Sequence, residues 1–105
     1  MPNIFVQMTP SVNSLSAPLT SEERVFFVDG EVKLAGRLQY KGEMTVLRAI
    51  TSAGGFTDFG KRTKIELRRA NGQKLFVNWY KAIEDSKADL LVYPNDHIIV
   101  RKKLW

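Results

Sequence analysis

The sequence contains no cysteine and a single histidine among its 105 residues. Without cysteine, neither a disulfide framework nor a thiolate metal site can form, and the redox compartment stays undecided. One histidine cannot build a metal site from several imidazoles, so we expect His97 to be an ordinary strand residue. The sequence therefore predicts no metal and no cofactor.

Long apolar runs are also missing. No stretch approaches the roughly 18 apolar residues that a membrane-spanning helix needs, so we expect no transmembrane segment. Residues 1–8 lack the basic start and the long apolar run of a secretory signal.

Acidic residues are fewer than basic ones. The chain has 16 Lys and Arg against 11 Asp and Glu, a formal net charge of +5. Both Glu22 and Glu23 precede the first basic residue, Arg24, so the part that follows is more basic still. A basic domain attracts anionic partners such as nucleic acid, anionic lipid or acidic polysaccharide, and charge alone does not choose among them.

Two regions differ in composition. Residues 1–23 are rich in Ser, Thr, Pro and Asn, which predicts a flexible N-terminal arm. Residues 24–105 contain the alternating and periodic patterns of one globular domain with a single modest core.

Five stretches have the composition of strands. Residues 24–32 and 37–41 predict a first hairpin, and residues 25–28, apolar on both faces, predict that its first strand is central in a sheet. Asn71-Gly72 lies between two further alternating runs, at 64–69 and 74–78, and is a strong hairpin signal. Residues 97–101 predict the last strand, after an apolar link at 90–93 and a turn at 94–96.

A helix is predicted between Thr45, which can cap its first turn, and Gly54-Gly55, which can end it. Its apolar face contains Val46, Leu47, Ile50 and Ala53, and Phe56 is expected to fold back onto that face. A second, shorter helix is predicted at 79–86 with Asn78 as its cap; Trp79, Ala82 and Ile83 share one side, and Tyr80 is expected to face outward.

Two hairpins flanking a helix, with the final strand inserted between the first and third, predict an α+β fold of the β-grasp (ubiquitin-like) type. In it a mixed sheet is covered on one face by one helix, with a short second helix beside it. A β-barrel with an inserted helix has the same order of elements and is the alternative.

Several blocks resemble the soluble ligand-binding β-grasp (SLBB) domain of bacterial polysaccharide export proteins. They are Val28-Asp29-Gly30-Glu31-Val32, Thr45 to Ile50, Ala53 to Thr57, and the residues of the second hairpin and closing strand up to Val100. The resemblance extends over residues 25–105 and implies structural roles for Gly30, Gly36, Thr45, Gly54, Gly55, Gly72 and Pro94.

The sequence departs from this family at three places. Ala35 stands where the family has proline, Asn95 stands where it has glycine, and Arg101-Lys102-Lys103 makes the ending more basic. Asn95 tolerates a left-handed conformation, so we expect the turn to survive. The export-sequence domain and lipobox cysteine of the exporters are absent, so we expect a module or adaptor.

No set of residues suggests catalysis: there is no histidine–acid–nucleophile combination and no phosphate-binding glycine motif. The carboxylates, Glu66 and Asp96 among them, are expected on turns and solvated faces. Carbohydrate sites combine aromatic rings with polar or charged groups, and the candidates for ligand binding are Arg37, Tyr40, Arg62, Lys64, Arg68 and Tyr80. Trp79 is expected in the core.

These observations favour a non-catalytic binding or assembly module of a polysaccharide export system. Its expected partners are an anionic polysaccharide or neighbouring export subunits, and nucleic acid is not expected. The resemblance implies a homo-oligomer in a larger assembly of the periplasm or cell envelope. Without a signal peptide, a cytoplasmic location stays open. A general β-grasp adaptor without a glycan ligand is the alternative; nucleic-acid binding ranks third, because the sheet lacks closely spaced exposed aromatics, and an enzyme ranks last.

Overall fold

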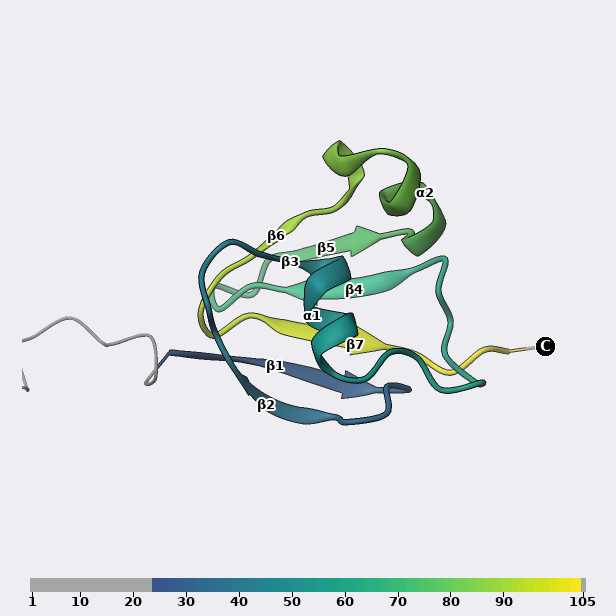
Figure 1. Ribbon diagram of the computed structural model, residues 1–105, viewed down its shortest axis with the longest axis horizontal. Helices are drawn as coiled ribbons and strands as arrows, with labels where there is room; N and C mark the ends of the chain where they lie inside the picture. The colour runs from purple at the N-terminus through teal and green to yellow at the C-terminus, as the bar shows by residue number, and fades with distance from the viewer. Residues whose placement is uncertain (1–23, 105) are drawn as a thin grey trace, which may run out of the picture.

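A computed structural model describes residues 24–104 of the chain; the arm predicted at 1–23 lies outside the described residues, as does residue 105. The main sheet has five strands: β1 (Val25–Gly30), β2 (Gly36–Gln39), β4 (Ile65–Arg68), β5 (Lys74–Val77) and β7 (His97–Val100). Their order across the sheet is β2-β1-β7-β4-β5 (Figure 1). No helix in the described part is both long enough and apolar enough to cross a membrane.

Strand β7 lies in the middle of this sheet. It pairs parallel to β1, with Phe27 opposite His97, and antiparallel to β4, with Leu67 opposite Ile98. The two predicted hairpins are the antiparallel pairs β1–β2 and β4–β5. The last strand therefore inserts between the hairpins, as the β-grasp prediction requires, and the fold class is confirmed.

Helix α1 (Val46–Ser52) begins and ends where the sequence predicts. The hydroxyl of Thr45 accepts a hydrogen bond from the amide of Arg48. At the other end, the amide of Gly54 donates to Thr51 O at 3.0 Å and that of Gly55 to Ile50 O at 2.9 Å. Both glycines have positive φ, 83° and 87°, so the pair forms the left-handed cap that ends the helix.

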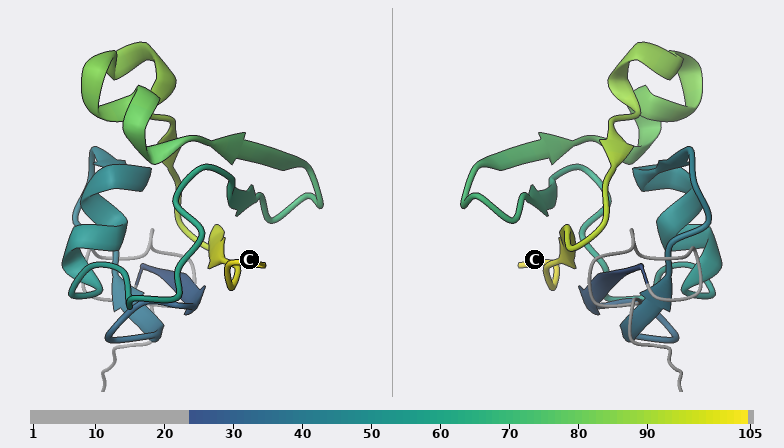
Figure 2. Two further views of the ribbon diagram at one scale, coloured as in Figure 1. Left: turned by 90° about the vertical axis from the view of Figure 1, so that its right-hand side faces the viewer. Right: turned by 90° about the vertical axis from the view of Figure 1, so that its left-hand side faces the viewer.

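The core lies between α1 and one face of the sheet (Figure 2). The helix contributes the fully buried Ala49 and Ile50, and the sheet contributes alternate residues of each strand, such as Phe26 and Ile98. The opposite face of the sheet carries no helix in the described part of the chain. On it, the ring of Phe27 stacks on that of His97 with centroids 4.5 Å apart.

Helix α2 (Trp79–Glu84) follows β5, and Asn78 caps it by accepting hydrogen bonds from the amides of Tyr80 and Lys81. It is followed by a 3-10 turn, η3 (Ser86–Ala88). Trp79 packs against the core, edge to face with Phe56. Ile83 is 59% exposed, so its predicted place on the apolar side is wrong. A helix of six residues has too few turns for spacing alone to decide which side is covered.

The apolar stretch 90–93, predicted as a link, contains a strand. Strand β6 (Leu91–Val92) pairs antiparallel with β3 (Met44–Thr45) in a second, two-stranded sheet. The segment just before β6 also contacts α1. A carboxylate oxygen of Asp89 accepts a hydrogen bond from the amide of Leu47 at 3.0 Å. The segment between the second hairpin and β7 is thereby fastened to the start of α1.

Two carboxylates predicted on solvated surfaces are buried: Glu66 is 4% and Asp96 2% exposed. Asp96 forms an ion pair with Arg69 and accepts a hydrogen bond from the amide of Tyr93 at 2.8 Å. Asn95 has a φ of 72°, which confirms that it takes the left-handed position of the turn. The turn before β7 is therefore closed by a buried ion pair as well as by its own backbone.

Candidate ligand-binding groove

Residues 60–64 lie between the segment after β7 and helix α2 and are hydrogen-bonded to both. Gly60 forms a β-bridge with Lys102, and the amide of Lys61 donates to Arg101 O at 2.8 Å. On the other side, the amide of Trp79 donates to Arg62 O at 2.8 Å. A Cβ on Gly60 would lie 3.0 Å from Glu31 O, so a side chain there would disturb this close packing. Backbone contacts therefore fix the positions of Lys61 and Arg62.

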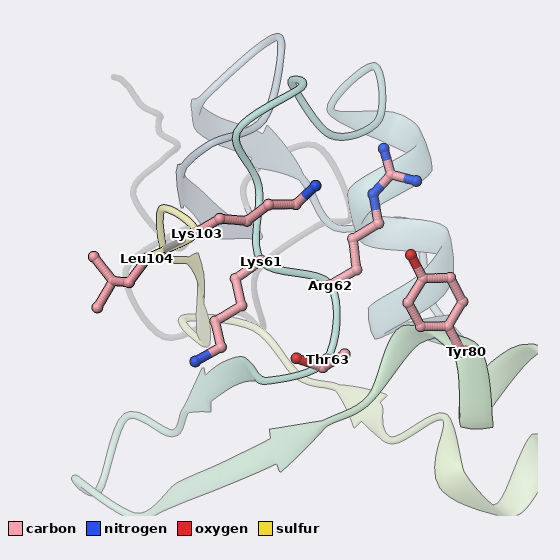
Figure 3. Close-up of a pocket in the computed structure, with 6 residues that line it drawn as sticks. All are labelled: Lys61, Arg62, Thr63, Tyr80, Lys103 and Leu104. Atoms are coloured by element: carbon pink, nitrogen blue, oxygen red, sulfur yellow. The ribbon is translucent and has the colours of Figure 1, made fainter.

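A first hollow of about 280 Å³ opens beside this segment (Figure 3). Figure 3 shows Arg62 and Tyr80 on the side that faces the helices, and Lys61 and Leu104 on the side that faces the C-terminal segment. The residues that line the hollow are Lys61, Arg62, Thr63, Tyr80, Lys103 and Leu104. The chain thus brings residues from three separate segments together around three cations.

The guanidinium group of Arg62 rests on the ring of Phe56, 5.0 Å from its centroid. The Nε atom of Arg62 is buried and has no hydrogen-bond partner in the described structure. Contact with an aromatic face restrains the side chain and favours its positive charge. Arg62 therefore presents a fixed cation at one wall of the hollow.

A second hollow of about 400 Å³ lies next to the first, since Lys61 and Leu104 line both. Its other lining residues are Lys64, Glu66, Phe76, Arg101 and Lys102. We call the two hollows together the basic groove. Six cationic side chains and one carboxylate line it, so its charge is strongly positive.

Glu66 is the carboxylate of the groove, and two arginines hold it. Arg68 donates to Glu66 Oε2 from Nε at 3.0 Å and from a terminal nitrogen at 2.7 Å, and Arg101 donates to Oε1 at 2.9 Å. Burial raises the pKa of Glu66, but the hydrogen bonds from Arg101 and Arg68 outweigh it and hold the pKa below the usual 4.5. Glu66 is therefore ionised at neutral pH and fixes the direction of both guanidinium groups.

Aromatic rings accompany the cations. The ammonium group of Lys64 lies 4.9 Å from the ring centroid of Phe76. Phe76 is 51% and Tyr80 53% exposed, so each offers part of a ring to the solvent. A concave surface with fixed cations and exposed rings can bind an extended anionic molecule, the cations meeting its charges and the rings its apolar faces.

The predicted binding residues fall into two groups. Arg62, Lys64 and Tyr80 line the groove, and Arg68 borders it through Glu66. Arg37 lies on β2, at the opposite edge of the sheet. Tyr40 is 8% exposed and belongs to the core. The structure thus brings four of the six candidates together and leaves Arg37 and Tyr40 elsewhere.

The C-terminal wall of the groove was not among the predicted candidates. It consists of Arg101, Lys102, Lys103 and Leu104. The basic run at the end of the sequence was the available signal, because a strand inserted next to β4 must end beside the residues that precede β4. Phe76 has no comparable signal beyond its position on an edge strand.

Neither histidine nor cysteine lines the groove. Among residues 24–104, no three His, Cys, Asp or Glu side chains are close enough together to hold a metal ion. His97 lies on the open face of the sheet, with its Nδ1 atom 3.9 Å from Asp29. The positive charge of the groove attracts anions.

Comparison with known protein families gives one match: residues 25–77, about half of the chain, match the SLBB domain. This range runs from the start of β1 to the end of β5 and includes α1 with its glycine cap. No curated protein matches the sequence.

Proposed function

The chain belongs to the SLBB domain family, and from this premise we propose that it is a non-catalytic binding module of a polysaccharide export system. SLBB domains are soluble ligand-binding domains associated with polysaccharide export. The ligand that we propose is an anionic polysaccharide, bound in the basic groove. The observation that supports this is the lining of the groove, which contains six cations and two exposed rings but only one carboxylate.

The shape and charge of the groove suit a polymer better than a small ion. Two hollows that meet at Lys61 and Leu104 give an extended surface with cations along its whole length. A polysaccharide with repeated carboxylate or other acidic groups would meet several of these cations at once, and Tyr80 and Phe76 would pack against sugar rings. Such binding weakens with salt, because exposed charges are screened.

Reversing charge within the groove tests the proposal. We expect the wild-type chain to bind alginate, a polyuronate, and not dextran, a neutral glucan, in isothermal titration calorimetry. Arg62→Glu/Lys64→Glu should weaken alginate binding at least tenfold, because it changes the charge of the groove by four units. The matched control is Lys74→Glu/Lys81→Glu, at two exposed lysines outside the groove. Equal loss in both double variants, or equal binding of dextran, would contradict a site in the groove.

We further propose that the module works in the cell envelope as part of a homo-oligomer. SLBB domains are typically periplasmic, which supports this location. Light scattering of the purified chain measures its oligomeric state, and a strict monomer that binds no acidic glycan would count against the whole proposal. Glycosyltransferase and chain-length-regulator genes beside the coding sequence would support it.

An adaptor that binds another protein is the second candidate, and the open sides of the main sheet favour it. Within the described residues, β2 and β5 each pair on one side only. An unpaired edge can accept a strand from a partner protein. A partner that binds the chain and competes with no glycan would support this function instead.

A further inference from the structure

Three segments meet at one end of the domain: residues 31–35 after β1, residues 54–61 after α1, and residues 101–104 after β7 (Figures 1 and 2). Backbone hydrogen bonds join them. The amide of Lys33 donates to Gly55 O at 3.0 Å, that of Thr57 to Glu31 O at 3.1 Å, and that of Lys103 to Phe59 O at 2.8 Å. We call the surface formed by these three segments the end face.

Each segment of the end face exposes one large apolar side chain. Leu34 is 63%, Phe59 50% and Leu104 93% exposed. Exposed apolar area of this size raises the free energy of the isolated domain by contact with water. One such residue needs no explanation, but three on adjoining segments of one face point to a surface that covers them.

The same three segments are basic. The three segments contain five basic residues, Lys33, Lys61, Arg101, Lys102 and Lys103, against two acidic ones, Glu31 and Asp58. The carboxylate of Glu31 accepts a hydrogen bond from the hydroxyl of Thr57. The ammonium group of Lys102 lies 5.5 Å from the ring centroid of Phe59, so a cation and an apolar anchor lie side by side.

We propose that the end face docks on the surface of an anionic lipid bilayer. In this arrangement Leu34, Phe59 and Leu104 enter the boundary between headgroups and acyl chains, and the lysines contact anionic headgroups. Apolar anchors combined with basic side chains are the two components of peripheral membrane binding. This goes beyond glycan binding, because Leu34, Lys33 and Phe59 lie outside the basic groove.

The arrangement of the residues favours a lipid surface over a protein partner. The buried centre of a protein interface is a continuous apolar patch in which lysine is depleted. On the end face, the exposed apolar residues stand singly on three segments that also contain four lysines. A fluid lipid surface accommodates separated anchors and offers a charged headgroup to each lysine.

Vesicle co-sedimentation of the full chain tests the proposal. We expect binding to mixed phosphatidylglycerol and phosphatidylcholine vesicles, and little binding to pure phosphatidylcholine. Leu34→Ser/Phe59→Ser should reduce the partition coefficient at least tenfold, since each anchor loses its transfer from water. Ile83→Ser, at a similarly exposed residue of α2, is the matched control and should bind as the wild type does. Circular dichroism checks that each variant is folded.

The lysines are tested in the same assay. Lys33→Gln/Lys102→Gln should lower the partition coefficient about fivefold for each charge removed. Lys74→Gln/Lys81→Gln removes two exposed charges elsewhere and should have little effect. Phe59→Trp keeps an anchor at the most central position, so it should bind at least as tightly as the wild type, with an emission that shifts to the blue on anionic vesicles.

Three outcomes would overturn the proposal. These are equal binding to both kinds of vesicle, full binding by Leu34→Ser/Phe59→Ser, and a Phe59→Trp emission that stays unchanged. Loss of vesicle binding in Arg62→Glu/Lys64→Glu alone would assign the attraction to the basic groove. Alginate binding by Leu34→Ser/Phe59→Ser should equal that of the wild type, so the two proposals fail or succeed separately.

Discussion

Replacing Glu66 by glutamine separates the effect of the negative charge on stability from the effect of the side-chain shape. Glutamine has nearly the same volume but no charge, and it has one acceptor oxygen where glutamate has two. In the wild type, both oxygens of Glu66 accept hydrogen bonds, one from Arg101 and the other from Arg68. Glu66→Gln therefore turns an amide group toward one guanidinium, where donor meets donor.

The expected loss of stability is about 1–2 kcal/mol. A hydrogen bond to a charged group contributes roughly 1.5–3 kcal/mol when it is well shielded from water. The side chain of Glu66 is 5% exposed, but those of Arg68 and Arg101 are 41% and 60% exposed. Solvent screens charges at such exposed arginines, and each can turn to water once its partner is gone, so the lower part of that range applies.

The loss of stability caused by Glu66→Gln becomes smaller at acidic pH. The pKa of Glu66 in the folded protein lies below its usual 4.5, so the folded protein takes up this proton less readily than the unfolded chain. The ion pairs therefore stabilise the fold fully above pH 4.5, and their contribution disappears as the pH falls through the lowered pKa. Glu66→Gln has no such proton to gain.

Urea denaturation followed by tryptophan fluorescence measures the free energy of unfolding of both proteins. The wild type should exceed Glu66→Gln by about 1–2 kcal/mol at neutral pH, and the difference should shrink toward zero at strongly acidic pH. The other carboxylates are present in both proteins, so their contributions to the pH dependence of stability cancel in the difference. A difference that stays constant with pH, or no destabilisation at neutral pH, would refute the assigned role of the two arginines.

Three further substitutions, the first with a matched control, probe the stability of the fold by thermal or urea denaturation. Gly30→Ala should lower the free energy of unfolding by about 3 kcal/mol or more, because the added Cβ would lie 2.0 Å from Val100 O. The control is Gly42→Ala, at a glycine that also has a positive φ but has nothing within 4 Å of the added Cβ, and it should cost only about 1 kcal/mol. Equal losses of stability in the two variants would exclude the clash at Gly30. Asp96→Asn should cost about 3 kcal/mol, because the mostly buried guanidinium group of Arg69 loses the carboxylate that balances its charge. Asn78→Ala should cost about 1 kcal/mol by removing the cap of α2; a neutral result would show that packing alone holds this helix.

Several parts of the fold that the sequence predicts correctly have local signals. Asn71-Gly72 sets the second hairpin, and Thr45 with Gly54 marks the two ends of α1, all through contacts within a few residues. The β3–β6 pair has no such signal. Met44 and Val92 are paired across 48 positions, and strands of two residues are too short to show alternation. Their pairing depends on how the rest of the chain packs.

Burial of Glu66 shows a second limit. Alternation correctly places it on the face opposite Ile65 and Leu67, but it does not tell how far that face is covered. Two long arginine side chains, Arg68 from the same strand and Arg101 from the residue after β7, cover the carboxylate. Likewise, Tyr40 shares a face with Leu38 and joins the core, so its ring serves packing. The residue type makes a side chain a candidate for binding, but its tertiary neighbours decide whether it is exposed.

The central place of β7 also orders the events of folding. Each hairpin can form from neighbouring residues, but Phe27 and His97 pair across 70 positions, and parallel pairing of this kind forms slowly. Strand β7 comes after all the other strands in the chain, so both hairpins leave the ribosome before the strand that joins them. Because the residues after β7 form one wall of the groove, the groove is completed last, and a chain that still lacks this segment has only part of it.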